Sequence, residues 1–348
     1  MAVYYLCPDS DHPTGGIRVI YRHVDVLNTH GIEAYVLHQR RGFRCTWFEN
    51  QTPVAYTRFP IGSLLARVTK KLREKFSPAS VQMIPIVGGA RAGIGVDDVL
   101  VLTETCGPDL AAVGRGIPRV ILNQNGFLTF KGYSFDKDKR KNPYSDPSVL
   151  AVLVNSEHCE EYVRYAFPDV NVCRFFLSVD PALFYFQRAK KKQICLSRVK
   201  SESDAMQVIN ILKHRDVLEE FDVVPFVNIP QQRVAELMRE SLIFLSFGYR
   251  EGFGLPAAEA MACGCIVIGY HGWGGREFFN PDWSFPIEDG DIIGFSSQVE
   301  QVIKRCNADS QYFSAQREQA ARFVASQYSL EKEERALVEI WNAILAPR

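Results

Sequence analysis

The chain has 348 residues, and its 40 basic and 40 acidic side chains cancel to a formal net charge of zero. This balance offers none of the overall positive charge that nucleic-acid binders use, although a local basic patch is compatible with it. Hydrophobic residues at 47% and charged residues at 23% exclude a disordered or fibrous chain. Because single hydrophobic cores stop growing at roughly 250 to 300 residues, two domains are expected.

The cysteines and the first residues bear on the cellular compartment. The nine cysteines form no CxxC pair and no ligand cluster, which predicts free thiols in a reducing cytoplasm. Residues 1–8 lack the basic start and apolar run of a signal peptide, and no stretch approaches ~20 apolar residues. We therefore expect a cytoplasmic protein. The basic amphipathic stretch 64–75 could meet anionic lipid at the inner face of a membrane or an acidic acceptor, but a solvated helix face is favoured.

The first half of the chain alternates short apolar runs with helical spacing. Residues 3–7 predict a strand, a loop rich in Asp, Pro and Gly follows, and apolar positions from Ile17 to Leu27 have helical spacing. A second strand is expected at 34–37. Further buried strands are expected at 99–102, 120–122 and 149–154. This repetition predicts a parallel sheet with helices on both faces.

The second half repeats the pattern. The charged segment 127–147 has no periodicity and is expected to be a loop before the passage into a second domain. A new series of strands is expected at 194–196, 223–227, 243–247 and 266–268, and an amphipathic helix at 330–345. We thus expect an α/β protein of two doubly wound domains, at 1–154 and 155–329.

The most informative segment follows the expected strand 243–247. Gly252 and Gly254 form a turn, and Pro256 opens a helix where its missing N–H is harmless. Unpaired N–H groups of such a loop and helix start suit a diphosphate. Glu251 and Glu259 lie on either side of this anion site, so they should reach different parts of one ligand.

This segment resembles the retaining family-4 glycosyltransferases of the GT-B fold. Glu251 and Glu259 reproduce their Glu-x7-Glu signature, and the flanking Glu-Gly-Phe-Gly-Leu-Pro and Glu-Ala-Met-Ala-Cys-Gly are also similar. The resemblance implies that Glu251 contacts hydroxyls of the donor sugar and that Glu259 binds the nucleotide ribose. It also implies that sugar and phosphate are held by the backbone amides of Gly252, Phe253, Gly254 and Leu255.

Two glycines follow the first expected strand. Gly15 and Gly16 permit close approach of the backbone to a ligand, and open parallel sheets bind ligands at the carboxyl ends of their strands. A plain turn is the alternative. The family carries a similar glycine loop that faces the cleft from the N-terminal domain.

Cations follow the first strand of the second domain. In the family, an Arg and a Lys near this place neutralise the donor diphosphate. Arg198 matches the Arg. The usual Lys lies farther along, where this chain has residues 201–204 without a cation, so Lys200 is expected as its stand-in. A solvated basic pair is the alternative.

Two further segments resemble the family less closely. Residues 123–126, Asn-Gln-Asn-Gly, follow a strand where many relatives place a His near the reacting sugar. Whether Asn123 and Asn125 contact the sugar or acceptor, or are turn residues, stays open. Residues 272–277 resemble a glycine-rich loop, in which Glu277 is expected to cap a helix. His271 is expected to be an ordinary loop residue.

The resemblance implies a GT-B fold, in which two Rossmann-like domains face a cleft and a terminal helix, 330–348, crosses back to the first domain. It implies transfer of a hexosyl group from a UDP- or GDP-sugar to a glycan, a lipid-linked or a small-molecule acceptor, with retention and without metal or cofactor. Such transfer would serve polysaccharide or glycoconjugate biosynthesis. A sugar-nucleotide 2-epimerase and a catalytically silent nucleotide-sugar-binding subunit are the alternatives. The base, the sugar, the acceptor and the oligomeric state leave no trace in the sequence.

Overall fold

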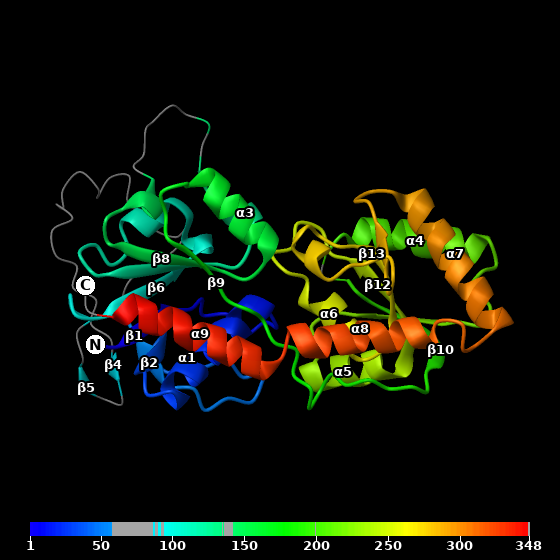
Figure 1. Cartoon of the computed structure of the whole chain (residues 1–348), viewed down its shortest axis with the longest axis horizontal. Coiled ribbons are helices and arrows are strands. Elements are labelled where there is room, and N and C mark those ends of the chain that lie inside the picture. The colour runs from blue at the N-terminus through cyan, green and yellow to red at the C-terminus, as the bar shows by residue number, and fades with distance from the viewer. Residues whose placement is uncertain are drawn as a thin grey trace. The chain divides into compact units, whose positions relative to one another are not determined.

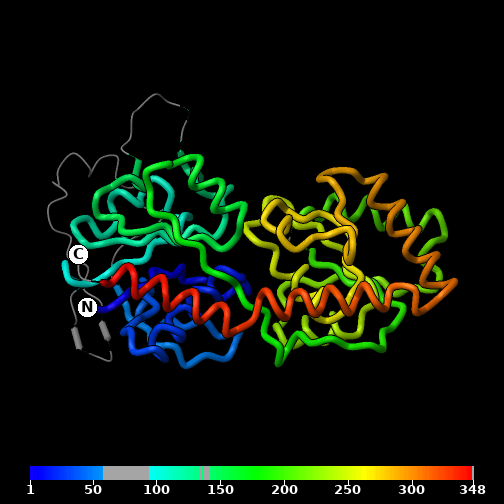
Figure 2. The backbone as a smooth tube through the Cα atoms, viewed as in Figure 1, coloured from blue at the N-terminus to red at the C-terminus, as the bar shows by residue number. Residues whose placement is uncertain are grey.

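The chain divides into two compact units in the computed structural model (Figures 1 and 2). The first comprises Met1–Asn155, Cys159–Phe175 and Arg335–Arg348, and the second comprises Ser156–His158 and Phe176–Glu334. The structure describes residues 1–57, 86–87, 90–91, 94–133, 135, 142–198 and 200–346. The basic stretch 64–75 and most of the charged part of the segment 127–147 lie outside these residues.

The first unit is built on one sheet, of strand order β5-β4-β3-β2-β1-β6-β7-β8-β9 in the described residues. Its strands are β1 (Val3–Leu6), β2 (Ala34–His38), β3 (Val54–Tyr56), β4 (Ile86–Val87), β5 (Ala90–Arg91), β6 (Val99–Thr103), β7 (Arg119–Asn123), β8 (Val149–Val154) and β9 (Val172–Arg174). The five strands predicted from the sequence pair in parallel. β4 and β5 add an antiparallel edge that was not expected, and β3 and β9 are too short to show a periodic pattern.

Helices cover both faces of this sheet. Tyr4 packs in a cluster with Leu110 of η1 (Glu104–Ala111) and Val163 of α3 (Glu157–Ala166). Tyr5 points to the opposite face, where its ring meets His23 of α1 (Gly15–Thr29). The indole N–H of Trp341 donates to the Tyr5 hydroxyl at 3.0 Å, so the last helix, α9 (Leu330–Leu345), packs on this face as well. Two short 3-10 turns, η2 (Gly126–Leu128) and η3 (Pro143–Ser145), complete the described part of the unit.

The second unit has an all-parallel sheet of order β11-β10-β12-β13-β14. The strands are β10 (Lys191–Ser197), β11 (Asp222–Phe226), β12 (Ser241–Phe247), β13 (Ile266–Tyr270) and β14 (Phe285–Ile287). The helices are α4 (Glu202–His214), α5 (Gln231–Glu240), α6 (Leu255–Ala262), α7 (Ile292–Ala308) and α8 (Ser314–Gln327), with the 3-10 turn η4 (Gly274–Glu277).

Both faces of the second sheet are covered too. Leu196 packs with Val208 of α4 and Val299 of α7. α5 and α6 contact the sheet as well, α5 at β10 and β12 and α6 at β12 and β13. Both units are therefore Rossmann-like α/β domains built on parallel sheets, which confirms the predicted fold class.

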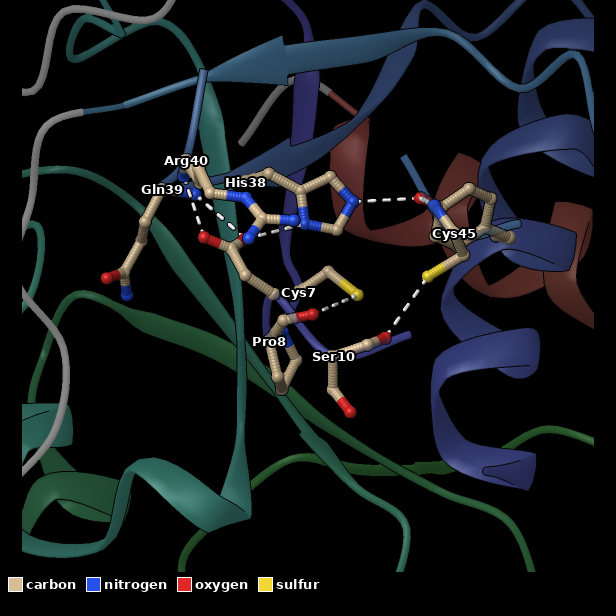
Figure 3. Close-up of polar contacts among 9 residues, drawn as sticks. Cys7, Pro8, Ser10, His38, Gln39, Arg40 and Cys45 are labelled. Atoms are coloured by element: carbon tan, nitrogen blue, oxygen red, sulfur yellow. Dashed lines mark hydrogen bonds and ion pairs between the residues drawn. The ribbon is translucent and has the colours of Figure 1, made fainter. Parts of the chain in front are cut away.

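A hydrogen-bond network centred on the buried His38 fixes the loops that follow β1 and β2 in the first unit (Figure 3). His38 Nδ1 donates to the Asp9 carboxylate at 2.9 Å, and the Tyr21 hydroxyl meets His38 Nε2 at 2.8 Å. The same carboxylate accepts from the backbone N–H of Arg40 at 2.7 Å, and the Cys45 N–H donates to the Tyr21 hydroxyl at 3.1 Å. Burial lowers the pKa of His38, so the imidazole is neutral and carries its proton on the nitrogen that faces Asp9. This network anchors the segment that leads into Gly15 and Gly16.

Replacing His38 by alanine should lower the free energy of unfolding by about 2 kcal/mol, because it leaves the buried Tyr21 hydroxyl without its acceptor. Urea denaturation measures the change. The matched control is His12→Ala, at an exposed histidine in the loop after β1, and it should change stability by less than about 0.5 kcal/mol. Equal effects of the two variants would show that the network does not anchor the loop.

Candidate functional site

The segment around Glu251 folds as the strand, turn and helix predicted from the sequence. β12 ends at Phe247, and Gly254, with φ of 95°, precedes the first residue of α6 in a left-handed conformation that favours glycine. Pro256 lies in the first turn of α6. Gly264, with φ of 79°, follows the helix, and β13 begins at Ile266.

The start of α6 offers free hydrogen-bond donors. Within the described part of the chain, the backbone N–H groups of Phe253, Gly254 and Leu255 donate no hydrogen bond. Unsatisfied N–H groups at a helix start carry partial positive charge. The arrangement can therefore bind an anionic group such as a phosphate.

Glu251 and Lys200 meet at the carboxyl edge of the second sheet. Lys200 follows β10 and Glu251 follows β12, and these strands are parallel neighbours, so their carboxyl ends lie together. The Lys200 ammonium lies 2.6 Å from the Glu251 carboxylate, and the two side chains are 41% and 22% exposed. The structure thus brings together an accessible cation and an accessible carboxylate. Glu251 lies two residues before Phe253, whose N–H is the first of the three that bond no other described residue.

A second glycine loop holds Glu251 in place. The Glu251 N–H donates to the Gly272 carbonyl at 2.8 Å, and the Gly274 N–H donates to the Glu251 carbonyl at 3.2 Å. A Cβ at Gly274 would lie 2.2 Å from the Gly252 carbonyl oxygen, so only glycine allows the two loops to approach this closely. The loop after β13 therefore fixes the backbone that carries Glu251.

The other predicted residues of the second unit have different surroundings. The Arg198 guanidinium pairs with Glu202 in the first turn of α4, and both side chains are about half exposed. The structure therefore pairs Arg198 with Glu202 and Lys200 with Glu251. Glu259 lies in the second turn of α6 and is 8% exposed. Its expected ribose contact stays a prediction.

Two supporting contacts involve residues far apart in the sequence. The Ser156 hydroxyl donates to the Gly252 carbonyl at 2.5 Å, a contact between residues 96 positions apart that no motif signals. Glu277 accepts from the N–H of Glu157, the first residue of α3, at 2.8 Å. Its other carboxylate oxygen accepts from the Tyr328 hydroxyl at 2.9 Å. Glu277 thus caps a helix, as expected from the sequence.

In the first unit, Gly15 and Gly16 open α1. The Gln124 side-chain amide donates to the Gly16 carbonyl at 3.1 Å, and a Cβ at Gly16 would lie 3.3 Å from the same amide. The loop after β7 therefore lies against the glycine loop after β1, at the carboxyl edge of the first sheet. No sequence signal paired these two loops.

Asn123 and Asn125 have structural partners. The Asn123 side-chain amide donates to the Thr129 hydroxyl at 2.8 Å and to the Tyr144 hydroxyl at 3.0 Å. The Asn125 side-chain oxygen accepts from the Phe127 N–H at 3.0 Å, which caps η2. Between the two interpretations left open by the sequence, these contacts favour turn residues.

His271 also acts within its loop, because its Nδ1 accepts from the Trp273 N–H at 3.0 Å and burial lowers its pKa.

All nine cysteines are free thiols. In the described ranges, no group of three or more His, Cys, Asp or Glu side chains could hold a metal ion. No helix within those ranges is long and apolar enough to cross a bilayer.

Comparison with known proteins gives matches in sequence and in structure. Residues 201–319 match the family described as Glycosyl transferases group 1. The chain is 31% identical over 216 residues to an alpha-1,6-glucosyltransferase of Actinobacillus pleuropneumoniae serotype 7. The aligned region covers 56% of this chain and 59% of that protein. It is 35% identical over 103 residues to the N-acetyl-alpha-D-glucosaminyl L-malate synthase of Bacillus anthracis, covering 29% of this chain and 26% of that protein. The chain thus spans less than two thirds of either relative.

Solved structures match along nearly the whole chain. Sucrose-phosphate synthase of Thermosynechococcus elongatus gives a TM-score of 0.68 at 14% identity, covering 99% of both chains. Anabaena HepE in complex with UDP and glucose gives 0.63 at 13% identity, covering 99% of this chain and 100% of that one. Identities this low establish the fold alone.

The matched family region contains Glu251 and Glu259, and Arg198 and Lys200 come just before it. Both units are Rossmann-like, and their structural neighbours are GT-B glycosyltransferases. Residues 201–319 therefore form a glycosyl transferases group 1 domain, in a chain that has the GT-B fold.

Proposed function

We propose that this chain transfers a hexosyl group from a nucleoside diphosphate sugar to an acceptor hydroxyl, with retention of anomeric configuration, in polysaccharide or glycoconjugate biosynthesis. One observation carries the proposal: the Lys200–Glu251 pair adjoins three N–H groups at the start of α6 that bond no other described residue. The group 1 domain match over this segment supports it.

The positive groups suit a departing diphosphate. Negative charge grows on the leaving group as the bond to the anomeric carbon breaks, and preorganised donors aimed at that charge lower the barrier. The N–H groups of Phe253, Gly254 and Leu255 and the Lys200 ammonium supply such donors. Arg198 can join them at little cost, because its pair with Glu202 is half exposed and such pairs contribute only ~0 to 1 kcal/mol.

The carboxylates suit the two polyhydroxyl parts of the donor. In this proposal the diphosphate takes Lys200 from Glu251, and the freed Glu251 carboxylate accepts hydrogen bonds from sugar hydroxyls. Glu259 binds the ribose. The acceptor oxygen then bonds to the anomeric carbon on the face that the diphosphate leaves, and the hydroxyl proton goes to the departing phosphate oxygen. No metal or cofactor is needed, because the cations and N–H groups neutralise the diphosphate.

The relatives suggest which donor to test first. Their names include an alpha-1,6-glucosyltransferase and an N-acetyl-alpha-D-glucosaminyl L-malate synthase, and HepE was solved with UDP and glucose. We therefore propose UDP-glucose as the first donor to test and a GDP-sugar as the second. The loops that carry Gly16 and Gln124 in the first unit are proposed to bind the acceptor, which is a glycan, a lipid-linked or a small molecule. A peripheral membrane contact is part of the proposal only for a lipid-linked acceptor.

Nucleotide binding should be visible as thermal stabilisation. A ligand at 100 times its dissociation constant adds ~2.7 kcal/mol to the free energy of unfolding, so UDP or GDP should raise the melting temperature. Lys200→Met should reduce the shift, since it removes a diphosphate partner. Lys191→Met is the matched control, because Lys191 begins β10, the strand that Lys200 follows, and forms a comparable exposed pair with Glu240. An unchanged melting temperature with every nucleotide and nucleotide sugar would contradict the proposed donor site.

Glu251→Gln should lower kcat for transfer by about 100-fold or more, because a carboxylate that orients the donor sugar loses its charge. The control is Glu240→Gln, which removes the carboxylate of the Lys191 pair and should leave kcat unchanged. Steady-state kinetics with the accepted donor measure both. Full activity of Glu251→Gln would show that Glu251 does not orient the donor sugar.

The product should have the same anomeric configuration as the donor sugar, and EDTA should not reduce the rate. Proton NMR of the product reports the configuration through its anomeric coupling constant. An inverted product would exclude retention, and metal-dependent turnover would exclude the proposed role of the cations. Formation of an epimer from the nucleotide sugar without any acceptor would favour the epimerase instead.

A further inference from the structure

A buried carboxyl in the first unit has no role in the site described so far. Glu104 follows β6, begins η1 and is 3% exposed. Its Oε2 is buried and has no hydrogen-bond partner among the described residues, and the same is true of the buried Oδ1 of Asn123. Orphaned buried acceptors are rare and costly, so two in one place require an explanation.

The two orphaned atoms belong to neighbouring residues. Thr103 pairs with Leu122 in the parallel register of β6 and β7, and Glu104 and Asn123 are the next residues along the two neighbouring segments. Tyr144 lies beside both. Its hydroxyl accepts from the Asn123 amide at 3.0 Å, and its pKa is raised first by burial and then by the Glu104 charge. The carboxyl and the amide oxygen therefore occupy one buried place.

One proton satisfies both atoms. A carboxylate oxygen and an amide oxygen only accept hydrogen bonds, but a protonated carboxyl donates one. The Asn123 amide nitrogen already donates to Thr129 and Tyr144, so its oxygen is the end left for Glu104. We propose that Glu104 holds a proton that it donates to Asn123 Oδ1, and that this hydrogen bond positions the loop Asn123–Gly126.

This loop connects to the glycine loop after β1. Asn123 ends β7 and leads into the loop. The Gln124 side-chain amide donates to the Gly16 carbonyl, and the Asn155 amide donates to the Gln124 carbonyl at 2.9 Å. Loss of the Glu104 hydrogen bond would free the side chain of Asn123, next to the residue that contacts Gly16. Glu104 is thus a positioning residue, and only its consequence for sugar transfer rests on the function proposed above.

The electrostatic surroundings agree with a bound proton. Burial raises the pKa of Glu104 to about 7, and the backbone N–H groups of Gln124 and Asn125 and the Lys131 ammonium oppose this effect. Among the described residues, the Cys106 thiol on η1 and the Tyr144 hydroxyl are also in electrostatic contact with it. A raised carboxyl pKa means that the folded protein binds a proton that the unfolded chain releases. The stability that this bound proton gives the folded protein is present at low pH and is lost as pH rises towards about 7.

Glu104→Gln isolates this effect, because the glutamine amide has the same shape and donates to Asn123 Oδ1 at every pH. Urea denaturation from about pH 5 to about pH 8 should show the wild type losing stability relative to Glu104→Gln as pH rises. Between the unfolded and folded pKa values of Glu104, the bound proton makes the folded-to-unfolded ratio of the wild type fall about tenfold per pH unit relative to Glu104→Gln. Comparison of the two proteins cancels the buried His23 and His38, whose lowered pKa values give the opposite slope. Glu49→Gln sets the baseline for removing an exposed carboxyl.

A stability difference that does not change with pH would overturn the proposal. It would mean that Glu104 is ionised and that the Asn123 amide is reversed, with its nitrogen donating to the carboxylate and its oxygen accepting from the Tyr144 and Thr129 hydroxyls. If Glu104→Gln does not fold, wild-type protein labelled with ¹³C at the glutamate carboxyl decides the question. A buried carboxyl signal that titrates near pH 7 supports the proposal, and its absence overturns it.

Hydrogen exchange of the peptide that spans residues 123–129 tests the positioning role. After correction for the intrinsic exchange rate, its protection in the wild type should fall about tenfold or more between about pH 6 and pH 8, and not in Glu104→Gln. Unchanged protection would show that the proton does not position the loop. None of these measurements uses a nucleotide or a sugar, so their failure would leave the proposed transferase untouched.

Discussion

The Lys200–Glu251 pair exists because parallel strands end at the same edge of a sheet. Lys200 and Glu251 are far apart in the sequence, yet the pairing of β10 with β12 places their side chains 2.6 Å apart. The same edge receives the start of α6, with its free N–H groups, and the loop after β13 that holds the Glu251 backbone. Positive charge, a carboxylate and backbone donors therefore gather through sheet topology alone.

The sequence predicts most of the fold because the central strands are apolar on both faces and the helices between them have regular spacing. It predicts the turn at Gly252 and Gly254 for a similar reason, since Gly254 needs a left-handed backbone and Pro256 fits only the start of a helix. β3, β4, β5 and β9 are two or three residues long and carry no periodic signal. The antiparallel edge of the first sheet could not be predicted for that reason.

The side-chain partners were harder to predict than the backbone. The sequence predicts Lys200 beside the diphosphate site, and the structure pairs it with Glu251. Arg198 instead pairs with Glu202, which lies in the segment 201–204 where the family has its Lys. The contact between Ser156 and Gly252 depends on tertiary structure and has no local signal. Glu104 shows the same limit. Its sequence neighbours give no hint that it is buried or that it lies near Asn123, and only their common neighbour Tyr144 shows this.

We propose that the start of α6 and the Lys200–Glu251 pair receive the diphosphate and sugar of the donor. A crystal structure of the protein with UDP-glucose tests it most directly. We expect phosphate oxygens within hydrogen-bond distance of the N–H groups of Phe253, Gly254 or Leu255 and of the Lys200 ammonium, and a sugar hydroxyl bound to Glu251. A nucleotide sugar bound elsewhere, with Lys200 still paired to Glu251, would contradict it.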